Sequence, residues 1–173
     1  MISEMKAKNW REPERPYTRA DYIAGAPQPR IAKYTMGKYS EDYEYELLLI
    51  AKEDMQVRDV ALESARVALT KKLSSELGNE GYFAELKAHP HHVLRENKLI
   101  FGAHADRLQE GMRRAFGKPV GRAARVTKGS PVFRVLVNEN GLQAAKEALD
   151  VASKKLPKSY RIVIRKLTPK AAS

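Results

Sequence analysis

The 173-residue chain contains no cysteine and no long apolar run, and these two absences exclude several classes of protein. Without cysteine there is no disulfide, no thiolate metal ligand and no cysteine nucleophile, which fits a reducing compartment. No stretch approaches the roughly 20 consecutive apolar residues that a spanning helix needs, so we expect no transmembrane segment. The N-terminus lacks the apolar core of a secretory signal, and we expect none.

Acidic side chains are fewer than basic ones, and they are unevenly distributed. The 21 Asp and Glu residues stand against 32 Lys and Arg, which gives a formal net charge of +11. Residues 41–110 have a net charge of −5, whereas residues 1–40 have +4, residues 111–138 have +7 and residues 139–173 have +5. A surface selected only for solubility mixes both signs. The segregation therefore favours an oriented face for a polyanion such as nucleic acid over a basic surface without a target.

Residues that could bind a metal or perform catalysis do not form a recognisable group. His89, His91 and His92 are close in sequence, but no carboxylate completes a tetrahedral ligand set at a suitable spacing, so a polar surface turn is the favoured interpretation. His104 lacks a serine at a nucleophile elbow, and no glycine-rich segment matches a phosphate-binding loop. We expect no catalytic residue, no metal and no cofactor.

Residues 1–30 are predicted to form an extended arm. Four of the nine prolines lie here, and proline is excluded from helix interiors. Arginines alternate with Trp10, Tyr17 and Tyr22 along the arm. Against RNA, guanidinium groups pair with phosphates and aromatic rings stack on unpaired bases. Packing of a ring onto the rest of the protein is the alternative for each aromatic residue.

Residues 31–173 are predicted to form a single α+β domain. Apolar residues at three- and four-residue spacing predict a helix from about 57 to 77, which Asp54 would cap and Gly78 would end. A second helix would begin after a cap at Asn138 or Asn140. Strands are expected within 31–36, 45–53, 82–90, 91–102, 131–138 and 160–167. Because several strands follow one another without a helix between them, we expect an antiparallel or mixed sheet with the two main helices on one side.

A long internal loop is predicted between residues 103 and 130. Connections inside a domain are usually about 4–6 residues long. The part with the sequence GMRRAFGKPVGRAARV, residues 111–126, holds five basic residues, no acidic residue and three glycines, which allow sharp turns or close backbone approach. Seven uncompensated cations from Arg113 to Arg134 would repel one another unless a phosphate backbone neutralised them. Phe116 would either anchor the loop to the domain or insert among bases.

Two stretches resemble a known family. Residues 8–38, KNWREPERPYTRADYIAGAPQPRIAKYTMGK, and residues 102–126, GAHADRLQEGMRRAFGKPVGRAARV, are the most specific, and the closing helix and strand agree with them. Together they are similar to the universal large-subunit ribosomal protein called L-sixteen in bacteria and L-ten-e in archaea and eukaryotes. The resemblance covers nearly the whole chain, and the N-terminal arm is similar to that of archaeal members.

The resemblance implies a hammerhead-type α+β fold and a structural role in the large ribosomal subunit in the cytoplasm. Members bind large-subunit rRNA near the tRNA-accommodation corridor, and their internal loop extends toward the peptidyl transferase centre. Here that loop would span about residues 103–117, with Arg107, Arg113 and Arg114 as its nearest cations. Expected partners are large-subunit rRNA, tRNA acceptor arms and neighbouring ribosomal proteins, with no membrane and no homo-oligomer.

Charge and resemblance together predict which residues contact rRNA. Basic side chains of the arm and of the C-terminal part of the loop would bind phosphates, and two tyrosines would pack or stack on nucleotides. These residues are Lys8, Arg11, Arg15, Tyr17, Arg19, Tyr22, Arg30, Lys33, Lys118, Arg122, Arg125 and Lys128.

The residues alone leave two other functions open. One is a binding module for structured RNA outside the ribosome. The other is an enzyme that modifies or cleaves RNA with His104 and neighbouring cations, and the lack of recognisable site chemistry disfavours it.

Overall fold

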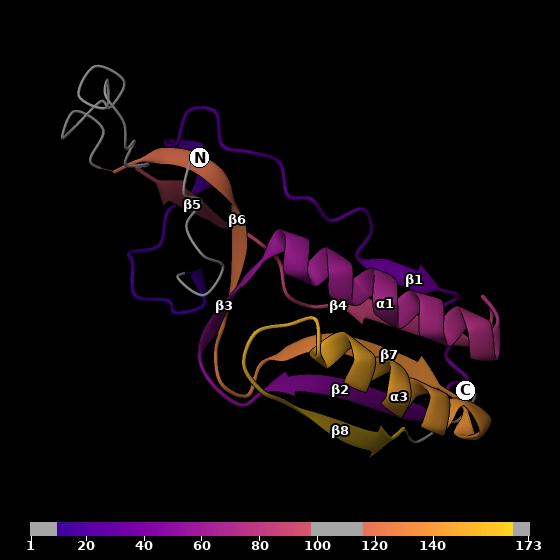
Figure 1. Cartoon of the computed structure of the whole chain (residues 1–173). Helices are drawn as coiled ribbons and strands as arrows, with labels where there is room; N and C mark the ends of the chain where they lie inside the picture. The colour runs from indigo at the N-terminus through magenta and orange to yellow at the C-terminus, as the bar shows by residue number, and fades with distance from the viewer. Residues whose placement is uncertain (1–9, 98–115, 168–173) are drawn as a thin grey trace, which may run out of the picture.

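The computed structural model describes residues 10–97 and 116–167, which form two antiparallel sheets and two main helices (Figure 1). The five-stranded sheet has the order β1-β4-β7-β2-β8, and the three-stranded sheet has the order β3-β6-β5. The fold is therefore α+β, as the sequence predicts. The strands are β1 Thr35–Gly37, β2 Tyr45–Ala51, β3 Met55–Arg58, β4 Tyr82–Leu86, β5 His92–Glu96, β6 Lys118–Val126, β7 Pro131–Val137 and β8 Tyr160–Lys166.

Helices α1 (Asp59–Leu77) and α3 (Leu142–Ser153) lie side by side over one face of the five-stranded sheet (Figure 1). Five consecutive residues of β2, from Leu47 to Ala51, are buried, and Leu47 and Leu49 belong to the main hydrophobic core with buried residues of both helices. Apolar residues of α1 recur every three or four positions and meet them. We call the five-stranded sheet with its two helices the body.

The helix ends show which capping predictions hold. Gly78 ends α1 with φ +69°, as predicted, because glycine adopts positive φ without a steric cost. Asp54 does not cap the helix, because residues 55–58 form β3 and Arg58 occupies the N-cap position. Neither Asn138 nor Asn140 caps α3, because the short 3₁₀ helix η4, Glu139–Gly141, precedes it and Gly141 is its N-cap.

The C-terminal part of the predicted loop is a strand. Residues 118–126 form β6, which pairs with β3 through Val57–Ala124 and with β5 through His92–Ala123. Gly117 has φ +76°, and a Cβ there would lie 2.5 Å from the backbone carbonyl carbon of Glu96. This glycine therefore allows β6 to begin in close contact with the end of β5. Residues 103–115 of the predicted loop lie outside the described residues.

The arm packs against both edges of the three-stranded sheet. The Gln56 amide of β3 donates to the Arg11 carbonyl at 2.8 Å, and the Val93 amide of β5 donates to the Thr18 carbonyl at 3.1 Å. Trp10, which is 7% exposed, packs with Leu94 and with Ala123 of β6. We call the three-stranded sheet with residues 10–30 the head. The domain boundary at residue 30 remains a prediction.

Two absences apply to the described part of the chain. Within residues 10–97 and 116–167, no helix is both long enough and apolar enough to cross a membrane. In the same ranges, no three His, Asp or Glu side chains are grouped so that they could hold a metal ion.

Candidate nucleic-acid interface

Within the head, two arginines of β6 attach the arm to the three-stranded sheet by donating hydrogen bonds to backbone carbonyls of the arm. Arg122 donates from Nε to the Pro27 carbonyl at 2.6 Å, and Arg125 donates to the Arg15 carbonyl. A carbonyl accepts the hydrogen bond but does not neutralise the charge. Within the described ranges, neither arginine forms an ion pair with a carboxylate. The two side chains therefore order the arm and keep their positive charge.

A stack of three side chains lies beside these contacts. The Tyr17 and His92 rings are stacked with centroids 5.5 Å apart, and the Arg125 guanidinium carbon lies 5.6 Å from the Tyr17 centroid. Tyr17 packs on His92 and remains 48% exposed. The structure thus shows the packing alternative for this tyrosine, and stacking on a base stays a prediction.

His92 is buried, which corrects the prediction of a polar surface turn for this residue. Burial, helped by the positive charges of Arg125 and Arg95, lowers its pKa to about 4. The ring is therefore neutral at pH 7, and its Nδ1 accepts a hydrogen bond from the Thr18 amide at 3.0 Å. A neutral His92 holds the arm in place without adding charge.

Two other aromatic rings are exposed, one on the arm and one just before β6. Tyr22, in the 3₁₀ helix η2 (Ala20–Tyr22), is 81% exposed, and Phe116 is 80% exposed. The Arg95 guanidinium carbon lies 5.4 Å from the Phe116 centroid, a cation–π distance. Phe116 is therefore not buried as an anchor, whereas Trp10 is. Exposed aromatic rings beside arginines are typical of surfaces that stack on unpaired bases.

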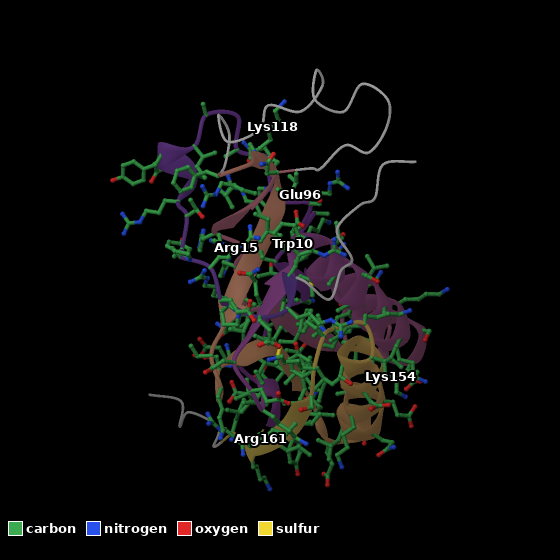
Figure 2. All side chains as sticks on the ribbon, turned by 60° about the vertical axis from the view of Figure 1, so that its left-hand side comes forward. Trp10, Arg15, Glu96, Lys118, Lys154 and Arg161 are labelled. Atoms are coloured by element: carbon green, nitrogen blue, oxygen red, sulfur yellow. The ribbon has the colours of Figure 1, made fainter. Side chains whose placement is uncertain are left out.

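The remaining predicted residues are spread more widely. Arg11, Arg15, Arg19, Arg30 and Lys33 are exposed along the arm and its continuation, and Lys118 is exposed at the start of β6. Figure 2 labels Arg15 and Lys118 among these residues. Lys128 lies just beyond the C-terminal end of β6, opposite to Lys118, and its amide donates to Asp54 at 2.7 Å. The structure does not describe Lys8, Arg107, Arg113 and Arg114.

Many cations of the body pair with carboxylates instead. Arg134 donates to Glu46 at 2.6 Å and lies 3.7 Å from Glu85, which corrects its interpretation as an uncompensated cation. The sequence interpretation failed because β7 places Arg134 between β2 and β4, whose glutamates are distant in sequence. Arg165 also contacts Glu46, at 3.7 Å. The head therefore differs from this part of the body by arginines that have no carboxylate partner.

Sequence reasoning overlooked Arg95. This residue lies in the segment with a negative net charge, so the charge distribution gives no reason to select it. On β5 it is partly exposed between the buried Leu94 and Glu96, and it contacts Phe116. The only sequence signal for it is a basic residue that follows the apolar Val93 and Leu94 within an expected strand.

Comparison with known proteins finds sequence similarity over most of the chain. The sequence profile of the family described as ribosomal protein L16p/L10e matches residues 12–163. A protein of Staphylothermus marinus is 52% identical over 154 residues, which cover 89% of this chain and 88% of that protein. A protein of Archaeoglobus fulgidus is 49% identical over 165 residues, which cover 95% of each. Both are named large ribosomal subunit protein uL16.

A third similar protein, also named large ribosomal subunit protein uL16, is from Sulfolobus acidocaldarius. It is 52% identical over 159 residues, which cover 91% of this chain and 90% of that protein. The family profile and these relatives all extend across both the head and the body. The chain belongs to the ribosomal protein L16p/L10e family.

Proposed function

We propose that the chain binds large-subunit rRNA through the head, near the tRNA-accommodation corridor and the peptidyl transferase centre, and helps to position tRNA. Family membership gives the broader role: a structural, non-enzymatic constituent of the large ribosomal subunit. In this role rRNA and neighbouring ribosomal proteins are its partners, and the ribosome in the cytoplasm is its location.

The observation that supports the rRNA interface is the bonding of Arg122 and Arg125. Both donate to carbonyls of the arm, so their positions are fixed while their charges stay available. Fixed cations bind a phosphate backbone with a smaller loss of side-chain entropy than free ones. Exposed rings at Tyr22 and Phe116 add surfaces on which unpaired bases can stack.

The proposed tRNA-facing group is Arg107, Arg113 and Arg114. It rests on the family resemblance and on the absence of acidic residues from 111 to 126. The proposed phosphate-binding group consists of Lys8, Arg11, Arg15, Arg19, Arg30, Lys33, Lys118, Arg122, Arg125 and Lys128. The two groups make separable predictions because one is on the internal loop and the other on the arm, its continuation and the residues from β6 to Lys128.

Deletion of residues 103–115, which retains Phe116, tests this division. We expect the shortened chain to co-sediment with large subunits nearly as well as the full chain, because the arm and β6 are retained. Peptide synthesis by ribosomes that contain it should fall by about tenfold or more, a loss of about 1.4 kcal/mol in activation free energy. Equal loss of co-sedimentation and synthesis would show that the loop is an anchor.

Co-sedimentation of the full chain also distinguishes the proposed function from that of an RNA-binding module outside the ribosome. A ribosomal protein should sediment with large subunits and be released only at high salt. A chain that binds RNA but stays at the top of the gradient at physiological ionic strength would contradict the proposal.

A further inference from the structure

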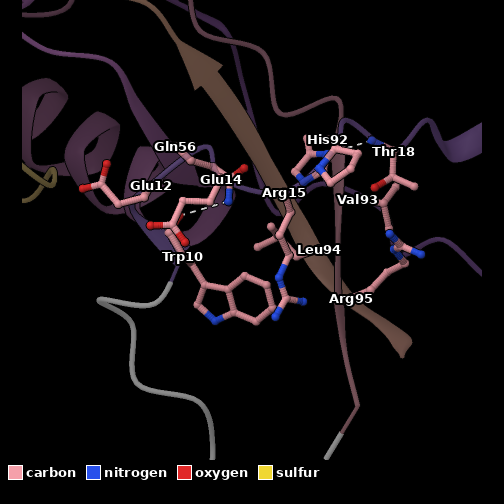
Figure 3. Close-up of a pocket in the computed structure, with 11 residues that line it drawn as sticks. Trp10, Glu12, Glu14, Arg15, Thr18, Gln56, His92, Val93, Leu94 and Arg95 are labelled. Carbon is pink, nitrogen blue, oxygen red and sulfur yellow. Dashed lines mark hydrogen bonds between the residues drawn. The ribbon is translucent and has the colours of Figure 1, made fainter. Parts of the chain in front are cut away.

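We infer that a pocket between the arm and β5 receives one unstacked nucleotide, with its base inside and its phosphate at the arginines of the rim (Figure 3). The inference rests on the proposed RNA-binding function and identifies a specific subsite for it. The pocket has a volume of about 430 Å³, within the range of about 300–1,000 Å³ that is usual for small-ligand sites. Residues of the arm, β3 and β5 line it together.

The apolar part of the pocket suits a nucleobase. Trp10, Pro16 and Leu94 line it, and the Trp10 carbonyl accepts a hydrogen bond from the Gln56 side chain at 3.0 Å, which fixes that residue's backbone. An indole ring and aliphatic carbons form the kind of surface on which a base removed from its stack regains contact. A phosphate ion alone would gain nothing from these groups.

Two arginines, Arg15 and Arg95, also line the pocket. Neither forms an ion pair with a carboxylate within the described ranges. Arginine binds phosphate through a planar fork of donors and also stacks on bases. Because Arg15 comes from the arm and Arg95 from β5, a nucleotide phosphate between them would join the two elements.

Glu14 gives the pocket a preference among bases. Glu12 is paired with Lys158 at 2.9 Å, whereas Glu14 has no hydrogen-bond or ion-pair partner in the part of the chain that the structure describes. A carboxylate only accepts hydrogen bonds, so it repels phosphate and favours N–H groups. Guanine presents a ring N–H and an amino group side by side on its Watson–Crick edge, whereas uracil presents a single N–H there. The pocket therefore favours guanine, and an acidic peptide is disfavoured.

Trp10 is the only tryptophan of the chain, so its fluorescence reports on this pocket directly. The full chain is titrated with guanosine 5′-monophosphate, uridine 5′-monophosphate and ribose 5-phosphate while the emission is recorded. We expect saturable quenching by the guanine nucleotide, with a dissociation constant at least about tenfold lower than that of the other two compounds. Equal affinity for ribose 5-phosphate, or no quenching by any of the compounds, would overturn the inference.

Matched pairs of variants test whether the nucleotide binds in this pocket. Arg15→Ala should weaken binding of the guanine nucleotide by about tenfold, whereas Arg161→Ala, at an exposed position of β8 outside the pocket, should change it less than twofold. Glu14→Gln should remove most of the preference for guanine over uracil, whereas Asp21→Asn should not. Equal effects of the pocket variants and their controls would refute the subsite.

Co-sedimentation of the same proteins distinguishes the two proposals. If the chain sediments with large subunits but no nucleotide quenches Trp10, the subsite is refuted and the proposed function stands. If the guanine nucleotide binds but the chain does not associate with large subunits, the proposed function is refuted. If both signals are present and Arg15→Ala lowers them together, the subsite acts in rRNA binding.

Discussion

At the scale of single residues, Phe116 shows how exposure separates a binding role from a packing role. The ring is 80% exposed, and it contacts the Arg95 guanidinium. Phe116→Ala should therefore change the free energy of unfolding by less than about 0.5 kcal/mol, as is usual for surface residues. The affinity for large subunits should fall by about 1–3 kcal/mol if a base stacks on this ring.

Urea unfolding and sedimentation at fixed salt measure the two quantities, and Phe116→Trp is the matched control that keeps a stacking surface. A loss of more than about 2 kcal/mol in unfolding free energy would show that Phe116 is a packing anchor after all.

His92 gives a pH dependence whose sign follows from its lowered pKa. The folded value is about 4, and the unfolded value is about 6.5, so between these values the unfolded chain binds a proton that the folded chain does not. The contribution of His92 to stability is therefore fully present above pH 6.5 and is lost as the pH falls toward 4. We expect a loss of about 2–3 kcal/mol over this range.

The measurement is urea unfolding of the wild type and of His92→Asn between pH 7 and pH 4. Asparagine cannot titrate here and can still accept the hydrogen bond from the Thr18 amide. The variant should lose less stability over this range than the wild type, whereas the exposed His89→Asn should behave as the wild type does. Parallel curves for all three proteins would contradict the assigned role.

At the scale of elements, the arm is held to both outer strands of the head, which predicts that it is ordered without RNA. The amides of Gln56 and Val93 donate to arm carbonyls, so they should exchange with solvent at least about tenfold more slowly than unprotected amides. Trp10→Ala should remove this protection, because it deletes the arm's buried contact with Leu94 and Ala123. Hydrogen exchange of the free chain is the measurement. Protection that arises only after RNA is added would mean that RNA orders the arm.

The elements also show what the sequence can predict and what it cannot. Helix α1 was predictable because Leu62, Leu69 and Leu73 repeat with helical spacing over many turns. Strand β3 was missed because Val57 fits the same helical pattern that begins after it. Strand β6 was missed because its glycines and proline are typical of loops, and its buried residues show alternation only near its end.

The candidate site was predictable only in part, because several of its contacts join residues that are distant in sequence. The basic character of the arm and of residues 118–128 is local information that composition reveals. The pairing of Arg134 with Glu46, the burial of His92 and the contact of Arg95 with Phe116 depend on strands that meet from distant parts of the chain. Charge counts cannot show which cations the protein neutralises itself.

At the scale of the whole molecule, the arginines of the head have no carboxylate partner among the described residues, whereas Arg134 and Arg165 of the body share Glu46. This predicts different salt dependences for substitutions in the two parts. Each phosphate contact contributes a slope of about 0.9 when the logarithm of affinity is plotted against the logarithm of salt concentration. Arg122→Gln should lower the slope for association with large subunits by about one unit, whereas Lys154→Gln in the body should leave it unchanged.

A sedimentation series between about 50 and 200 mM salt measures these slopes. Identical slopes for the wild type and Arg122→Gln would show that this arginine only fastens the arm and does not meet a phosphate.

The arm's hydrogen bonds to β3 and β5 also matter before the chain has met any partner. Unpaired strand edges recruit other strands, which leads to aggregation of newly made protein. Here the arm occupies backbone groups on both edges of the smaller sheet. The edge of the larger sheet at β8 has the exposed cations Arg161, Arg165 and Lys166, so two copies repel each other there. Aggregation of the newly synthesised chain through the edge strands β3, β5 and β8 is thereby disfavoured before the chain is assembled with its partners.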